Sequence, residues 1–194
     1  GLETAQCMSE RRRGGEVGIS RVLALRGERM WQYVADRPNT RRLLVSGLSR
    51  SHNLPVVEGY PSDAVTFAWA QSVFPEGWAY FIEHRDGFHT SLFMLDIRDF
   101  NYAGMTRSGE VISCQMYLPM PTHGSTTADF FSPQIRHIER MVTESRQPYP
   151  LERTLLTSGM TMAGVESFFR DAPVDTPQMA VKYKVPDESW FWND

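Results

Sequence analysis

Cysteine is scarce in this chain, which also has no long apolar run and no strong excess of charge. The two cysteines, Cys7 and Cys114, stand far apart among 194 residues, which fits neither a disulfide framework nor a paired metal site. We therefore expect buried thiols in a reducing, cytoplasmic compartment. No apolar run approaches the roughly 20 residues of a membrane-spanning helix, and no signal-peptide pattern opens the chain. A formal net charge of -3 argues against a nucleic-acid partner.

Motifs of common catalytic folds are also missing. The sequence contains no GxGxxG, no P-loop and no GxSxG, so neither a phosphate-binding loop nor a nucleophile elbow is visible. Apolar residues make up 41% and charged residues 22%, as in ordinary globular proteins. Together with the length, these values predict a single domain over residues 1–194.

The start of the chain reads as a helix. Leu2, Ala5 and Met8 suit one apolar face, and Arg11-Arg12-Arg13 followed by Gly14-Gly15 suits the C-terminal end of a helix. Nothing precedes Leu2 to cap the free N–H groups of this helix. We therefore expect a fragment or a liberated domain.

Several strands follow. Residues 17–25 alternate as a strand, and residues 29–34 suit a returning strand. The runs on either side of Asp86-Gly87 predict a hairpin with a two-residue type I′ turn, which pairs His84 with His89, Ile82 with Ser91 and Tyr80 with Phe93. Residues 99–106 and 110–118 extend this hairpin into an antiparallel meander, and residues 180–185 form a last strand.

Helical spacing dominates the second half. A short helix is expected over residues 41–49, before a long, partly structured loop over 52–76. One long helix is expected after Ser132-Pro133 and a second after Pro150. The inward positions predicted for these two helices are Phe131, Ile135, Ile138, Val142, Leu151, Leu155, Met162, Val165 and Phe169. In the second helix Gly159, Ala163 and Gly164 allow a close approach to a neighbour.

Strands followed by two helices predict an α+β fold, with an open, antiparallel-rich sheet and helices packed on one face. The predicted sheet is apolar on both faces, with Tyr80, Ile82 and Phe93 on one and Phe81, Leu92 and Met94 on the other. The uncovered face must then meet a partner subunit, another domain or the long loop. We therefore expect a homo-oligomer formed through the open sheet face.

Few side chains suggest chemistry. His84 and His89 share a face in the predicted register, but two histidines without a third ligand favour a solvated pair over a metal site. Residues 123–127 suit an anion site or a helix cap. Arg153 has no local reason to stand near a helix start, so it holds a carboxylate, a neighbouring domain or a surface ion pair. Residues 190–192, Trp-Phe-Trp, either fold back on the core or dock on a partner.

Three segments resemble a known family. They are LETAQCMSERRRGGEVGISRV, YFIEHRDG, and PYPLERTLLTSGM with DTPQMAVKY. They resemble the C-terminal part of an uncharacterised branch of the glucose-fructose oxidoreductase / inositol dehydrogenase (Gfo/Idh/MocA-like) superfamily. The resemblance implies a missing Rossmann domain that binds NAD or NADP. It places Glu3 at the acidic position of a family motif whose histidine would precede Gly1.

The resemblance therefore implies the substrate-covering and oligomerisation domain of an NAD(P)-dependent oxidoreductase acting on a sugar- or polyol-like substrate, inactive as this chain alone. Its candidate substrate or interdomain residues are Glu3, His84, Arg85, His89 and Arg153. No catalytic, cofactor-binding or metal residue is assigned within the chain. The alternative is a non-catalytic binding or scaffold protein of the same architecture. A metal-dependent hydrolase rests on the histidine pair alone.

Overall fold

The structure is a computed structural model, which describes residues 1–55, 65–116 and 127–185. Within these residues the helices and strands are, in order, α1 (Leu2–Ser9), β1 (Ile19–Arg26), α2 (Gly27–Ala35), α3 (Pro38–Leu48), α5 (Phe67–Val73), β2 (Trp78–His84), β3 (His89–Met94), β4 (Phe100–Met105), β5 (Val111–Met116), α6 (Thr127–Glu144), α7 (Leu151–Arg170), β6 (Val174–Asp175) and the short 3-10 helix η1 (Pro177–Met179). None of the helices in these ranges is both long and apolar enough to cross a membrane.

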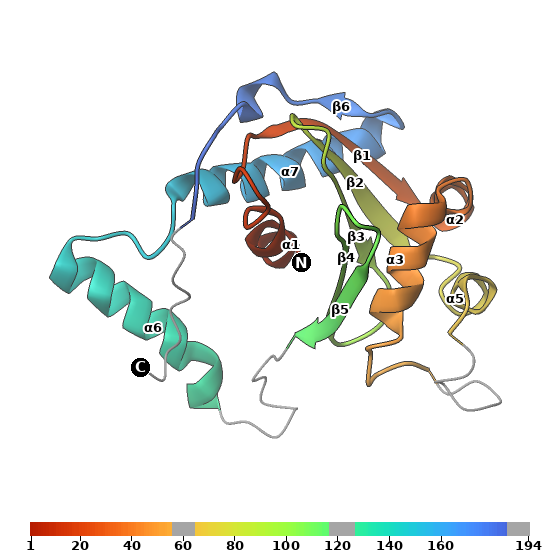
Figure 1. The fold of residues 1–194 in the computed structure, drawn as a ribbon, viewed down its shortest axis with the longest axis horizontal. Coiled ribbons are helices and arrows are strands. Elements are labelled where there is room, and N and C mark those ends of the chain that lie inside the picture. Colours follow the sequence, from red (N-terminus) through yellow and green to blue (C-terminus); the bar gives the residue numbers. More distant parts are fainter. Residues whose placement is uncertain (56–64, 117–126, 186–194) are drawn as a thin grey trace.

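An antiparallel sheet forms the centre of the molecule (Figure 1). Its strand order is β3-β2-β1-β6, with β1 paired to both β2 and β6. The α+β class and the antiparallel sheet are therefore confirmed. The continuous meander is wrong, because β4 and β5 form a separate two-stranded sheet that packs against α3.

The hairpin between β2 and β3 forms where it was predicted, but its register is shifted by one residue. Tyr80 pairs with Leu92 and Ile82 with Thr90. The turn contains three residues, 85–87, and ends at Gly87 with φ 79°, the left-handed position that a three-residue hairpin loop requires. A shift of one residue moves every β3 side chain to the opposite face.

On one face, the core lies between the sheet and α7. Val22, Ile82, Leu156 and Met160 are buried there. Gly164 allows the close approach that the sequence predicts, because a Cβ at this position would lie 2.3 Å from the ring of Tyr80.

The predicted inward face of α7 is wrong. The expected residues all lie on the solvent side of the helix and are 53–91% exposed, namely Leu151, Leu155, Met162, Val165 and Phe169. The buried side carries Leu156, Met160 and Ala163 instead. Both stripes have helical spacing, so periodicity could not determine which one faces the core.

The other sheet face is covered by helices of the same chain. Residues 29–34, predicted as a strand, belong to α2, where Met30, Trp31 and Val34 are buried. The indole N–H of Trp31 donates to the carbonyl of Phe74 at 2.9 Å, which ties α2 to the end of α5. Figure 1 shows α2, α3 and α5 together on this side of the sheet. The face that we expected to meet a partner is therefore filled from within the chain.

Helix α6 lies away from the sheet (Figure 1). It begins at Thr127, so Pro133 lies inside the helix and not at its first turn as predicted. Its predicted inward residues, Phe131, Ile135, Ile138 and Val142, are 44–71% exposed.

The C-terminal part of the described chain also differs from expectation. The predicted strand over residues 180–185 is wrong, since the chain makes only one isolated bridge there, between Tyr183 and Glu16. The two thiols are not fully buried, and Cys114 is exposed. The Trp-Phe-Trp segment 190–192 and residues 123–126 of the predicted anion loop lie outside the described residues.

Candidate functional site

Two buried carboxylates lie where α1, α7 and the β2–β3 hairpin meet. Glu10 follows the end of α1, and Glu16 lies just before β1. They are 1% and 0% exposed. A buried carboxylate is costly unless it is paired and hydrogen-bonded, so the partners of these two residues define the candidate site. We call Gln6, Glu10, Arg12, Glu16, His84, Arg153 and Tyr183 the polar cluster.

Glu16 accepts hydrogen bonds from every side. Arg12 donates to both of its carboxylate oxygens, at 2.9 and 3.0 Å. Gln6 donates at 2.8 Å, and the backbone N–H groups of Val17 and Gly18 donate at 2.9 Å. Burial alone would raise the pKa of Glu16, but the hydrogen bonds from His84, Arg12 and Gln6 outweigh it and hold this pKa well below its usual range.

Glu10 has its own cationic partner. Arg153 of α7 donates to both carboxylate oxygens of Glu10, from Nε at 3.0 Å and from Nη2. The hydroxyl of Tyr183 donates to Glu10 at 2.7 Å and accepts from Gln6 at 2.9 Å. Gln6 therefore links the two carboxylates, and burial together with the bond to Glu10 raises the pKa of Tyr183.

His84 extends the cluster to the hairpin. Its Nδ1 lies 3.1 Å from Glu16 Oε1, and its Nε2 lies 3.0 Å from Thr90 Oγ1. The Thr90 hydroxyl in turn lies 3.1 Å from that of Ser9 on α1. A hydroxyl, an imidazole and a carboxylate in this order can activate a nucleophile in hydrolases.

The surroundings favour a structural role for this relay. The His84 and Glu16 side chains are at most 1% exposed, which leaves no approach for a substrate to the imidazole. Glu16 is held by Arg12, which also pairs with Asp86 of the hairpin turn, so this carboxylate belongs to a wider ionic network. The relay therefore joins α1 to β3 as a buried contact.

The structure brings two of the five sequence-predicted site residues, His84 and Arg153, into this cluster. Glu3 lies outside it and accepts a hydrogen bond from Thr157 on α7. Arg85 lies next to His84 in the chain but donates to the carbonyls of Thr176 and Pro177.

His89 is not part of the cluster. It pairs with Glu83 and is exposed, so the predicted pairing with His84 is wrong and the two imidazoles lie on opposite faces of the hairpin. In the ranges that the structure describes, no group of three or more His, Cys, Asp or Glu residues could hold a metal ion.

Sequence reasoning missed the two carboxylates. Arg12 was read as part of an exposed helix end, yet its side chain is only 13% exposed. The one available signal was the presence of Glu10 and Glu16 on either side of the Arg11–Arg13 run. The side-chain partners of Glu10, Arg153 and Tyr183, stand more than 140 positions away from it, and this separation in the sequence hid the pairing.

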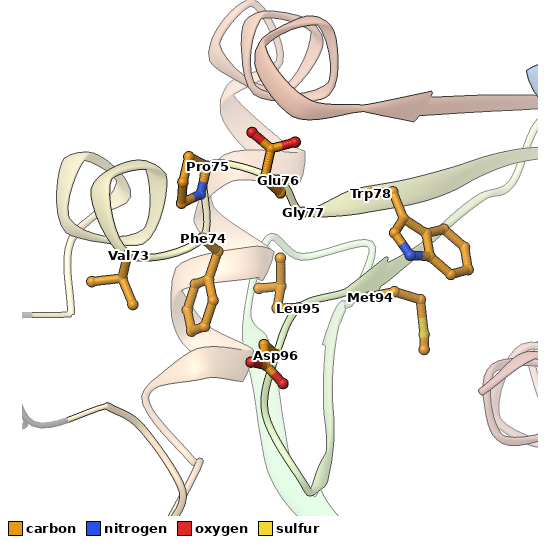
Figure 2. Close-up of a pocket in the computed structure, with 9 residues that line it drawn as sticks. All are labelled: Val73, Phe74, Pro75, Glu76, Gly77, Trp78, Met94, Leu95 and Asp96. Atoms are coloured by element: carbon orange, nitrogen blue, oxygen red, sulfur yellow. The ribbon is translucent and has the colours of Figure 1, made fainter.

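A pocket lies at the other end of β2. It has a volume of about 440 Å³, and Figure 2 shows the carboxylates of Glu76 and Asp96 on opposite sides of the apolar Phe74 and Leu95. Its lining residues are Val73, Phe74, Pro75, Glu76, Gly77, Trp78, Met94, Leu95 and Asp96. None of the predicted site residues lines it. Two carboxylates without a lining cation disfavour phosphate and favour hydroxyl or cationic groups.

The geometry thus gives a saturated polar cluster that joins four parts of the chain, and a separate acidic pocket. Comparisons of this chain with protein-family models, with curated proteins and with solved structures found no match.

Proposed function

We propose that this chain is the substrate-covering and assembly part of a cytoplasmic, two-domain NAD(P)-dependent oxidoreductase that acts on a sugar- or polyol-like substrate. Hydride transfer then requires a separate dinucleotide-binding domain, which binds NAD or NADP. The proposal starts from the sequence resemblance described above. Two features of the described residues support it, the outer face of α7 and the saturation of the polar cluster.

The outer face of α7 is the main structural support for the proposal. Leu155, Met162 and Phe169 are 53%, 73% and 91% exposed on this face, while Leu156 and Met160 are buried on the opposite one. A helix that is apolar on both sides is normally covered on both. The outer face therefore suits an assembly role, in which a second polypeptide surface completes the packing.

The polar cluster supports a non-catalytic role. Each of its carboxylates is fully hydrogen-bonded and faces an arginine. Because Arg153 and Glu10 join α7 to the end of α1, the cluster holds α1 in a fixed position. In the proposed function α1 carries Glu3 next to the dinucleotide domain, and Glu3 orients a neighbouring group without reacting itself.

The substrate contacts in this proposal come from groups that solvent reaches. His89 and Arg85 are both exposed near the hairpin turn, and they remain candidates for contacts to a hydroxylated substrate or to the second domain. His84 and Arg153 act through the cluster, because their side chains are 1% and 13% exposed.

The proposal is tested by reading the coding sequence upstream of Gly1 and expressing the longer protein. We expect an upstream dinucleotide-binding pattern, and a longer protein that binds NADH or NADPH in a fluorescence titration. The 194-residue chain alone should show no shift in melting temperature with either cofactor. A coding sequence without such a pattern would support the scaffold alternative. Tight cofactor binding by the 194-residue chain itself would contradict the division of roles.

A further inference from the structure

Helix α6 carries an apolar face that the other described helices and strands do not cover. No helix or strand in the described residues packs along it beyond isolated contacts. Ile135, Ile138 and Val142 are nevertheless 51%, 44% and 71% exposed on one face of its 18 residues. Helices of this length gain most of their stability in proteins from tertiary packing of the apolar face. The face formed by these three side chains therefore suits a further packing partner.

The exposed apolar faces of α6 and α7 share the same spacing of residues. On α6, Phe131, Ile135, Ile138 and Val142 follow each other at intervals of four, three and four residues. On α7 the outer face follows the same alternation, at positions 151, 155, 158, 162, 165 and 169, with Ser158 as its one polar member. Alternating intervals of four and three make the apolar seam that packs against a like seam in paired helices.

The backbone at the start of α7 directs α6 away from the exposed apolar face of α7 in the same chain. Pro150 caps α7 without a side-chain hydrogen bond, and the ring of Tyr149 lies under the Arg153 guanidinium, 4.7 Å from it. Arg153 is itself held by buried Glu10. Because Pro148 and Pro150 restrict the connecting backbone, α6 leaves α7 in the direction seen in Figure 1 and does not fold back along it.

We propose that α6 packs on the outer face of α7 of a second copy of this chain, and that the two copies exchange their α6 helices around a two-fold axis. This inference rests on the assembly role proposed above. Each chain supplies one apolar seam on α6 and one on α7. Two copies can therefore cover all four seams with each other and without any other partner, as an isologous interface requires.

The size of the two seams suits a stable dimer. Eight large apolar side chains supply their exposed surface, Ile135, Ile138, Val142, Leu151, Leu155, Met162, Val165 and Phe169. If each loses roughly 60–120 Å² of accessible surface, each copy buries on the order of 500–1,000 Å². The total over both copies then falls near the ~1,600 Å² of a standard stable interface.

The test compares neighbouring substitutions on α6 by light scattering over a range of concentrations. The intact chain should have about twice its mass of 22.2 kDa. Val142→Glu places a charge in the seam and should raise the dimer dissociation constant by at least about tenfold. Thr143→Glu introduces the same charge one residue along, on a different face of α6, and should leave the dimer intact. A monomeric intact chain, or a dimer that tolerates Val142→Glu, overturns the proposal.

Cross-linking then identifies the partner. In a Cys114→Ser background, one preparation carries Ile138→Cys and a second, larger tagged one carries Met162→Cys. A short bismaleimide should join one tagged to one untagged chain in the mixture. A double variant that instead links within one chain would show α6 folded on its own α7, and would overturn the exchange. A chain ending at residue 185 should still dimerise, whereas loss of the dimer would assign the seams to residues 186–194.

These outcomes separate the two proposals. A monomeric chain removes the exchanged dimer, but it leaves the cofactor titration of the longer protein to decide the oxidoreductase assignment. A dimer with the expected cross-links, combined with a longer protein that binds no nicotinamide cofactor, would keep the interface and remove the enzymatic role.

Discussion

Arg153 on α7 holds Glu10 at the end of α1 through two hydrogen bonds, and Glu10 is 1% exposed. The pair joins residues that are 143 positions apart. It also fixes the orientation of the two helices that lie on the same side of the sheet. We therefore expect the stability of the domain to depend on this contact.

We expect Arg153→Ala to lower the free energy of unfolding by about 3–5 kcal/mol, because the substitution leaves the buried Glu10 side chain without its cationic partner. Urea unfolding measures the change. Arg170→Ala is the control on the same helix, since Arg170 pairs with Glu166 at the surface and such pairs contribute less than about 1 kcal/mol. Equal effects of the two substitutions would show that the Glu10 pair is not a buried anchor. The double variant Glu10→Leu/Arg153→Met should recover part of the loss.

The fold class was predictable because local signals agreed with it. Alternating apolar residues on both sides of Asp86-Gly87 predicted the hairpin, and a close helix approach was predicted at Gly164. The register was not predictable, because Asp-Gly suits both a two-residue turn and the last two positions of a three-residue turn. The choice between them follows from packing, which places Leu92 of β3 against the core on the α7 side and Phe93 against the core on the other side.

The limits of periodicity explain the other errors. In α7 two apolar stripes have helical spacing, and only the tertiary structure determines that Leu156 and Met160 face the sheet. In α2, the short run with Met30, Trp31 and Val34 fits a strand or one turn of a helix equally well. The polar cluster depends on contacts between residues far apart in the sequence, such as Glu10 with Tyr183. Single-sequence patterns carry no information about such contacts.

Acidification should destabilise the domain through Glu16. The folded state lowers the pKa of this carboxyl, so the ionised form contributes its full stabilisation above the unfolded-state pKa of about 4.3. The contribution decreases as the pH falls from about 5 toward the lower folded-state pKa. Glu16→Gln should therefore be less stable than the parent at pH 7 and lose less stability between pH 6 and pH 3. Urea unfolding of both proteins at several pH values measures these changes. Equal losses of stability in the two proteins between pH 6 and pH 3 would contradict the assignment.

Gly164 should be intolerant of even a methyl group. A Cβ there would lie 2.3 Å from the Tyr80 ring, so Gly164→Ala must displace the ring or the helix. We expect a loss of about 1–3 kcal/mol from overpacking, larger than the ~1 kcal/mol gained in helix propensity. Thr161→Ala, at an exposed position of the same helix, should change stability by less than about 0.5 kcal/mol. Thermal unfolding of both variants gives the comparison, and a stabilised Gly164→Ala would show that α7 does not touch the sheet at this point.

The two histidines of the hairpin should behave differently. His84→Ala removes a buried partner of Glu16 and Thr90, and we expect a loss of about 1–3 kcal/mol. His89→Ala affects an exposed side chain and should be nearly neutral. Added Zn²⁺ should not raise the melting temperature of the parent, because the two imidazoles lie on opposite faces. A zinc-dependent increase that is lost in either variant would restore the metal-site hypothesis.

The central claim is that the apolar faces of α6 and α7 are covered by a second copy of the chain. Hydrogen–deuterium exchange of the α6 backbone amides, measured over a wide range of protein concentrations, tests it most directly. We predict strong protection of residues 131–142 at high concentration, which falls on dilution together with the light-scattering mass. Fast exchange of these amides at every concentration, or protection that does not depend on concentration, would contradict the claim.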